Sequence, residues 1–207
     1  MSRRLILHKG LRKHWIGIWV DAMNKEFAEQ FDILMRMRRE EMLQNYGRVL
    51  PSGEYIYNRF DKARDLGFGE GSSIYDSSVV MGNIKVGSHV WIGPYTLLEG
   101  STASLTIGDF VSIDAGVMIY THDSTKYYVS GGKNPFDKGP VTIKDNTVIG
   151  TMSMIACNVT IGKHCVVAAH SFVNKDVEDY SIVAGCPAKK IGEVIEEEEG
   201  IRFEYYK

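Results

Sequence analysis

The sequence predicts a mainly β protein built around a triangular parallel solenoid, with a helical segment before it and a short tail after it. Two observations predict this fold. Between Phe68 and Val173 an apolar residue returns at every sixth position, in runs broken by the long interruption 120–140. The residues four positions further on are small or β-branched. We expect residues 1–66 to form an N-terminal head, 67–193 the solenoid, and 194–207 an acidic tail.

The composition excludes some classes of protein. A net charge of −2 and a pI near 6.3 leave no overall basic footprint, so nucleic acid is not an expected partner. The apolar runs are too short to span a bilayer, and no signal peptide pattern is present. The three cysteines lack metal-site spacing, which predicts reduced, buried thiols and a cytoplasmic protein.

The head contains two different segments. Residues 1–20 carry five Lys or Arg among apolar and aromatic side chains, a pattern that fits weak contact with an anionic membrane surface or packing against the protein or a sister subunit. From Ala22 to about Tyr46, apolar residues at helical spacing predict one amphipathic helix that ends at Gly47. The connector from Tyr55 to Leu66 has no clear assignment.

The period of six gives the solenoid its shape. An inward residue at position i and another at i+4, with a bend between them, make two short strands that meet at a corner. Three such sides close one coil of about 18 residues, and coils stack about 4.8 Å apart through parallel strand pairing. Pairs such as Ala115-Gly116 and Asp145-Asn146 suit the corners, because Gly and Asn accept positive φ. The fifteen inward positions are Phe68, Ile74, Val80, Val86, Ile92, Leu98, Ile107, Ile113, Ile119, Ile143, Ile149, Ile155, Ile161, Val167 and Val173.

This stretch resembles the left-handed parallel β-helix of the hexapeptide-repeat acyltransferases, in particular the branch that acetylates sugars. The resemblance covers Val80–Gly192 and is carried by the strings VWIGPY at 90–95, IYTHD at 119–123, VNKD at 173–176 and AGCPAKKI at 184–191. The chain departs from the family at Val148, where relatives commonly carry a tryptophan. The first sixty residues match no part of the family.

His122 is the first candidate for chemistry, because it lies where the repeat breaks and its side chain can leave the solenoid wall. Acetyl transfer from a thioester needs a base for the proton of the attacking hydroxyl or amine, and imidazole suits this task. Asp123 is adjacent but points the wrong way in an extended segment. The resemblance implies His122 as the catalytic base and an acid near Glu99 as the group that orients the histidine or the sugar.

The resemblance also implies binding residues. The interruption 120–140 is expected to close the acceptor site over a neighbouring subunit. The expected acceptor contacts are Asn83, Tyr95, Asp123, Lys133 and Asn134. Acetyl-CoA is expected to lie along Thr151 and Ala169, with its adenosine and phosphate end near Asn174, Lys175, Lys189 and Lys190.

The predicted function is therefore an acetyl-CoA-dependent O- or N-acetyltransferase for a sugar or nucleotide sugar, acting as a homotrimer without a metal. A serine-type or antibiotic-type acceptor and a catalytically inactive scaffold remain alternatives. A γ-class carbonic anhydrase uses the same coil but needs three histidine ligands, and Val117 and Tyr127 stand where a second histidine would be required. The tail is expected to form a short helix that covers the last coil.

Overall fold

The computed structural model describes residues 25–206, and the chain divides into two compact units between Ile56 and Tyr57. The first unit contains helix α2 (Lys25–Tyr46) and the short helix α3 (Gly53–Ile56). The predicted amphipathic helix is confirmed, but its side chains at Phe27, Phe31 and Leu34 are 40% or more exposed. Residues 1–20, with their predicted membrane contact, lie outside the described part. No helix in residues 25–206 combines the length and apolar character needed to cross a bilayer.

The second unit begins with helix α4 (Arg59–Asp65), which packs against the first strand of the solenoid. The Asn58 side chain caps this helix, because its Oδ1 accepts a hydrogen bond from the Phe60 amide at 2.8 Å. The connector that had no assignment from sequence is thus largely helical. Helix α4 precedes the predicted start of the solenoid at residue 67, yet it belongs to the same unit as the coils.

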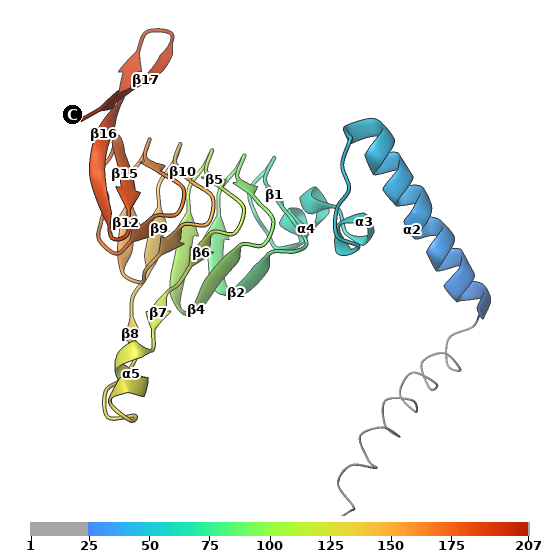
Figure 1. Cartoon of the computed structure of the whole chain (residues 1–207), viewed down its shortest axis with the longest axis horizontal. Helices are drawn as coiled ribbons and strands as arrows, with labels where there is room; N and C mark the ends of the chain where they lie inside the picture. Colours follow the sequence, from blue (N-terminus) through green and yellow to red (C-terminus); the bar gives the residue numbers. More distant parts are fainter. Residues whose placement is uncertain (1–24, 207) are drawn as a thin grey trace, which may run out of the picture. The chain divides into compact units, whose positions relative to one another are not determined.

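Short strands in parallel register build the coils (Figure 1). One sheet has the order β1-β3-β5-β10-β13-β15-β16-β17 and a second has the order β12-β9-β4-β6-β11-β14, with β2 paired to β4. Strand β4 turns a corner, so its first residues pair with β6 and its last with β9. The bounds are β1 Ser73–Ile74, β2 Val79–Val86, β3 Trp91–Ile92, β4 Leu97–Ile107, β5 Ser112–Ile113, β6 Met118–Ile119, β9 Val141–Ile143, β10 Val148–Ile149, β11 Met154–Ile155, β12 Val159–Ile161, β13 Val166–Val167, β14 Phe172–Val173 and β15 Ser181–Gly185.

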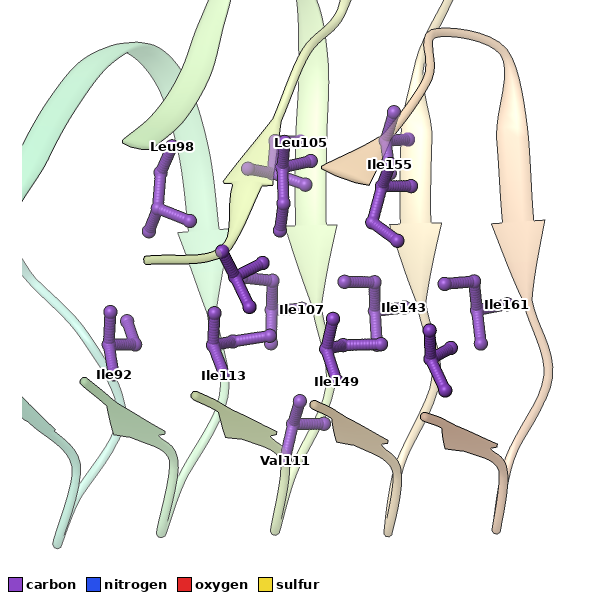
Figure 2. Close-up of a cluster of buried hydrophobic side chains, with 14 of the residues drawn as sticks. Ile92, Leu98, Leu105, Ile107, Val111, Ile113, Ile143, Ile149, Ile155 and Ile161 are labelled. Atoms are coloured by element: carbon purple, nitrogen blue, oxygen red, sulfur yellow. The ribbon is translucent and has the colours of Figure 1, made fainter. Parts of the chain in front are cut away.

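The core follows the repeat predicted from the sequence. All fifteen inward positions are buried except Phe68 and Val80, which are half-buried against the same core. Figure 2 shows part of this core, in which aliphatic side chains such as Ile92, Ile113 and Ile149 stack from coil to coil inside the solenoid. The positions four residues further on, among them Val90, Thr147 and Ser171, are also buried. The fold class predicted from the sequence is confirmed, and burial of this continuous aliphatic column is the main stabilising contribution.

The corners use left-handed backbone three residues after the inward position. The predicted corner residues Gly116, Asn146 and Asn158 have positive φ at this position, and so does Gly82, which lies two residues after Val80. Larger residues also adopt positive φ at these corners, at a steric cost in free energy that glycine avoids. Stacking of side chains on successive coils offsets part of this cost, as where His164 lies over Tyr180 with ring centroids 4.9 Å apart. The non-glycine corners of this kind are His89, Tyr95, Phe110, Asn146, Met152, Asn158, His164, His170 and Tyr180.

Two sequence predictions are wrong, one on the tail and one on the burial of the cysteines. The tail forms an antiparallel hairpin of β16 (Ala188–Glu197) and β17 (Gly200–Tyr205), not a helix. The physical reason is that Ile201, Phe203 and Tyr205 alternate with polar residues at strand spacing. The three cysteines are free, as predicted, but only Cys165 is buried, and Cys186 is exposed between β15 and β16.

The interruption of the repeat has a structure of its own. Strands β7 (His122–Asp123) and β8 (Asp137–Lys138) pair antiparallel, and the short helix α5 (Thr125–Val129) lies between them. In Figure 1 this segment projects from the side of the solenoid beside β6. An ion pair of 2.7 Å between Lys126 and Asp137 joins the helix to β8. We call residues 120–140 the excursion.

Candidate active site

His122 lies at the base of the excursion. It follows β6, whose Ile119 points into the core, and it occupies the position that forms a left-handed corner in other coils. Here the chain instead pairs with β8, and His122 stands opposite Lys138. The side chain is 27% exposed, so the imidazole is partly open to solvent. The break in the repeat therefore places this ring outside the wall, as the sequence predicted.

Glu99 reaches the same ring from the neighbouring coil. The register of β4 with β6 sets Leu98 beside Ile119, so the next residue, Glu99, lies beside the start of the excursion. Its carboxylate is 2% exposed, and Oε2 lies 3.0 Å from Nδ1 of His122. A buried carboxylate needs several donors to remain charged. Here they come from the Ser101 amide and hydroxyl and from the Thr121 amide and hydroxyl, the last two at 3.1 and 2.9 Å.

These hydrogen bonds decide the charge of the pair. Burial alone would raise the pKa of Glu99, but the donors on Ser101 and Thr121 outweigh it and lower the pKa to about 2. Glu99 is therefore a carboxylate at neutral pH and can only accept from His122. Nδ1 of His122 then carries the proton, and Nε2 presents a lone pair on the other side of the ring. This is the tautomer that a general base requires.

Aromatic side chains of the excursion surround His122. Phe136 stacks on the imidazole with centroids 5.8 Å apart and planes 16° from parallel, while Tyr120 meets it edge-on at 6.4 Å. Sequence reasoning missed Phe136 and Tyr120, and it also missed Ser101 and Thr121. Thr121 precedes the histidine in the IYTHD string, so its position was a usable signal. Phe136 lies fourteen residues beyond His122, and only the pairing of β7 with β8 brings it back.

The structure separates the predicted acceptor contacts into groups. Asn83 lies in the coil next to that of Glu99, because its carbonyl faces Gly100. Asp123 follows His122, but its carboxylate accepts the Thr125 amide at 2.7 Å, and the Thr125 side chain and amide lower its pKa. Lys133 and Asn134 are exposed in the loop between α5 and β8. Tyr95 is 62% exposed at the corner between β3 and β4, which is a different corner from that of His122.

The predicted cofactor residues fall into two places. Thr151 and Ala169 are exposed and stand in register on adjacent coils, where the His170 amide donates to the Thr151 carbonyl at 2.9 Å. Asn174, Lys175 and Lys190 line one surface pocket of about 240 Å³. Lys189 is exposed on β16 and does not line that pocket.

The charges around this pocket are mixed. Lys190 is paired with Glu193 at 2.7 Å, a hydrogen bond that raises its pKa, and Glu178 lies 4.0 Å away. Within residues 25–206, no ion pair involves Lys175 or Lys189. These two cations are therefore the ones able to meet an incoming anion without first losing a partner. In the same range, no group of three or more His, Cys, Asp or Glu side chains is arranged to hold a metal ion.

Known proteins share this repeat and fold. The family model for the bacterial transferase hexapeptide (six repeats) matches residues 140–175. The chain is 40% identical to serine acetyltransferase 4 of Arabidopsis thaliana over 55% of its own length and 31% of that protein. It is 29% identical to galactoside O-acetyltransferase of Escherichia coli K12 over 60% of its length and 61% of that protein. It thus spans less than two thirds of either relative.

A solved structure extends the likeness to more than three quarters of the chain. A hexapeptide-repeat-containing acetyltransferase of Vibrio cholerae, complexed with acetyl-coenzyme A, superimposes with a TM-score of 0.60 and 27% identity. The match covers 78% of this chain and 88% of that chain. The fold is therefore a left-handed parallel β-helix with hexapeptide repeats. The predicted resemblance to the hexapeptide-repeat acyltransferases, with a sugar acetyltransferase among the relatives, is confirmed.

Proposed function

We propose that this protein is an acetyl-CoA-dependent acetyltransferase that acts on a hydroxyl or amine of a sugar or nucleotide sugar. The observation that carries the proposal is the pair formed by buried Glu99 and half-exposed His122 at the break in the solenoid. Glu99 fixes the proton on Nδ1, so Nε2 is free to act as a base. The similarity to a galactoside O-acetyltransferase and to an acetyltransferase complexed with acetyl-coenzyme A supports the donor and the sugar acceptor.

The residues present fit a thioester donor with an anionic end. Thr151 and Ala169 are small, exposed residues on adjacent coils, so a long, thin chain could lie along the outer surface there. Lys175 and Lys189, which have no ion-pair partner among the described residues, suit phosphate groups. Acetyl-CoA supplies the acyl group as a thioester when bound.

His122 moves the proton in this reaction. Nε2 takes it from the acceptor hydroxyl or amine as that atom forms its bond to the thioester carbonyl carbon. The carbon–sulfur bond then breaks, and Nε2 returns the proton to the sulfur, so the imidazole is neutral again at the end. The Glu99 carboxylate steadies the positive charge that the ring carries in between. No acyl-enzyme forms along this route.

We also propose that the molecule is a trimer. Five apolar side chains stand in register on the outer surface of one side of the prism, in a row that includes β6, the strand that leads to His122. Of these, Val79, Met118 and Met154 are 37–50% exposed in the single chain. Such a continuous apolar row favours contact with another copy. The expected solution mass is three times 23.3 kDa, and Met154→Lys should lower it. The five are Val79, Leu97, Met118, Met154 and Phe172.

We also propose that the protein is cytoplasmic, and its three free thiols support this location.

An assay of thiol release from acetyl-CoA tests the function. The purified full chain is incubated with galactosides, amino sugars, nucleotide sugars and L-serine as separate acceptors. A sugar should release CoA, and His122→Ala should lower the rate by a factor on the order of 10² or more. His89→Asn is the matched control, since it removes an imidazole from a distant corner where Asn also tolerates positive φ.

Each other result has a definite meaning. Release of CoA with L-serine and not with a sugar would overturn the sugar acceptor and make serine the acceptor, as in the name of the Arabidopsis relative. An unchanged rate in His122→Ala would remove His122 as the base. A chain that binds acetyl-CoA but releases no CoA with any acceptor would favour the inactive scaffold.

A further inference from the structure

The hydrogen bond to Glu99 holds His122 at one atom only. Nδ1 is fixed at 3.0 Å from Oε2, but the imidazole can still turn about that contact and about its own side-chain bonds. The direction of the Nε2 lone pair depends on the plane of the ring. A base displaced by about 1 Å can lose on the order of 10² in rate. A second contact is therefore needed to define the plane.

Phe136 supplies that contact. Its ring lies against the face of the imidazole, with centroids 5.8 Å apart and planes only 16° from parallel. Tyr120 meets the same imidazole at 89°. The Phe136 and Tyr120 rings together leave the imidazole little freedom to rotate, because a change of its plane would bring it into collision with one of them.

Phe136 is itself held by a second ring and by its neighbour in β8. The Tyr127 ring packs on it at 75°, with centroids 5.0 Å apart. The next residue, Asp137, is tied to Lys126 by the 2.7 Å ion pair and stands opposite Asp123 in the β7–β8 register. Phe136 is half-buried, although it lies outside the aliphatic core of the solenoid. Its packing therefore serves the excursion and the histidine, not the wall.

We propose that Phe136 is a positioning residue, which sets the plane of the His122 imidazole so that Nε2 faces the acceptor. This inference rests on the proposed function. It adds that Phe136 acts on the rate of the chemical step through His122, while the binding of either substrate depends on other groups.

The test compares Phe136→Leu and Phe136→Tyr with Tyr128→Leu in the full chain. Tyr128 is 72% exposed in the same loop. Its ring contacts Phe136 at 6.4 Å and Tyr127 at 5.3 Å, and among the described residues it makes no ring contact with His122. We expect Phe136→Leu to lower kcat roughly tenfold, with both KM values within about twofold of the original. Phe136→Tyr keeps the ring and should restore most of kcat. Tyr128→Leu should keep kcat within about twofold.

A second measurement does not depend on activity. In histidine-labelled protein, the Nδ1–H proton of His122 should give a slowly exchanging NMR signal, because it is bonded to a buried carboxylate. Phe136→Leu should lose that signal to exchange, while Tyr128→Leu keeps it. Melting temperatures of all variants establish that they are folded.

Three outcomes would overturn the inference. The first is a Phe136→Leu protein that keeps both its kcat and the Nδ1–H signal. The second is an equal loss in Phe136→Leu and Tyr128→Leu, which would assign the effect to the loop as a whole. The third is a raised KM for the acceptor at unchanged kcat, which would make Phe136 a binding residue. If the original protein shows no turnover at all, the proposed function fails, and the NMR signal still decides the positioning role.

Discussion

The wall of the solenoid and the excursion diverge at one backbone position. Ile119 and Ile155 stand in register on adjacent coils, and both are fully buried. Three residues further on, Asn158 turns the corner with a φ of +61°, whereas His122 continues into β7 and pairs with β8. The same register thus produces a closed corner in one coil and an accessible imidazole in the other.

The difference separates stability from chemistry. In the wall, each coil satisfies its backbone groups through the neighbouring coils and buries one aliphatic column, so little is left to react. In the excursion, rings and ion pairs replace the aliphatic core, and polar atoms stay accessible. Glu99 belongs to the wall and His122 to the excursion. The candidate site therefore needs both regions: the wall holds the carboxylate rigidly, and the excursion leaves the base accessible.

The largest expected effect is a loss of stability when a core residue of the solenoid wall is truncated. Ile149→Ala removes a fully buried side chain between two coils and should lower the free energy of unfolding by about 4 kcal/mol, because the neighbouring coils cannot close the cavity. Val148→Ala on the same strand is the control, since its side chain is 39% exposed, and it should cost less than about 1 kcal/mol. Denaturant unfolding measures both. Equal losses would contradict the view that the inward column carries the stability.

The next effect concerns Glu99, the wall residue that contacts the excursion, and is measured as the pH dependence of stability. The pKa of Glu99 is lowered from 4.5 to about 2, so its charge stabilises the fold fully above pH 4.5. This contribution, about 3 kcal/mol, is lost as pH falls from 4.5 through 2, because the folded state then has to accept a proton it disfavours. Acid unfolding curves should show this loss in the original protein and lack it in Glu99→Gln.

Glu204→Gln is the control for the acid experiment, since Glu204 is exposed on β17. It should keep the loss of stability between pH 4.5 and 2. If the Glu99→Gln curve has the same shape as that of the original protein, Glu99 is not the charged, buried group described above.

The wall could be predicted almost in full from the sequence, because its determinants are local and periodic. A residue such as Ile149 is recognised from its place in the count of six, and a corner such as Ala115-Gly116 from its own backbone preference. Large residues at left-handed corners, such as Phe110, carry no such signal, since only stacking with the next coil makes them acceptable. The C-terminal hairpin was missed although its alternation was present in the sequence.

The site could be predicted only in part, because its geometry depends on contacts between distant residues. The position of His122 follows from the break in the repeat. The burial of Glu99 depends on hydrogen-bond donors from Ser101 and Thr121 in two coils. The six-residue period predicts which residues point inward, but it does not predict these hydrogen bonds. Phe136 depends on how the excursion folds back. The apolar spacing of α2 predicts its helix correctly but does not say that Phe27 and Phe31 stay exposed.

The smallest expected effect lies at Thr121, which belongs to both regions. Its side chain is fully buried like the wall, yet its hydroxyl donates to the same Glu99 oxygen that accepts from His122. Thr121→Val keeps the shape and removes this donor, which should cost about 1.5 kcal/mol at pH 7. The loss should shrink below pH 3, where Glu99 begins to protonate in the variant and no longer needs the donor.

Thr142→Val is the matched control for this change, because Thr142 is a half-buried outward residue of β9. It should change the unfolding free energy by less than about 0.5 kcal/mol at either pH. A loss in Thr121→Val that does not depend on pH would mean that the hydroxyl matters through packing and its hydrogen bonds with Thr102 and Ala103, and not through Glu99. A loss that fades in acid would show that the wall holds the Glu99 carboxylate for the histidine through this hydroxyl.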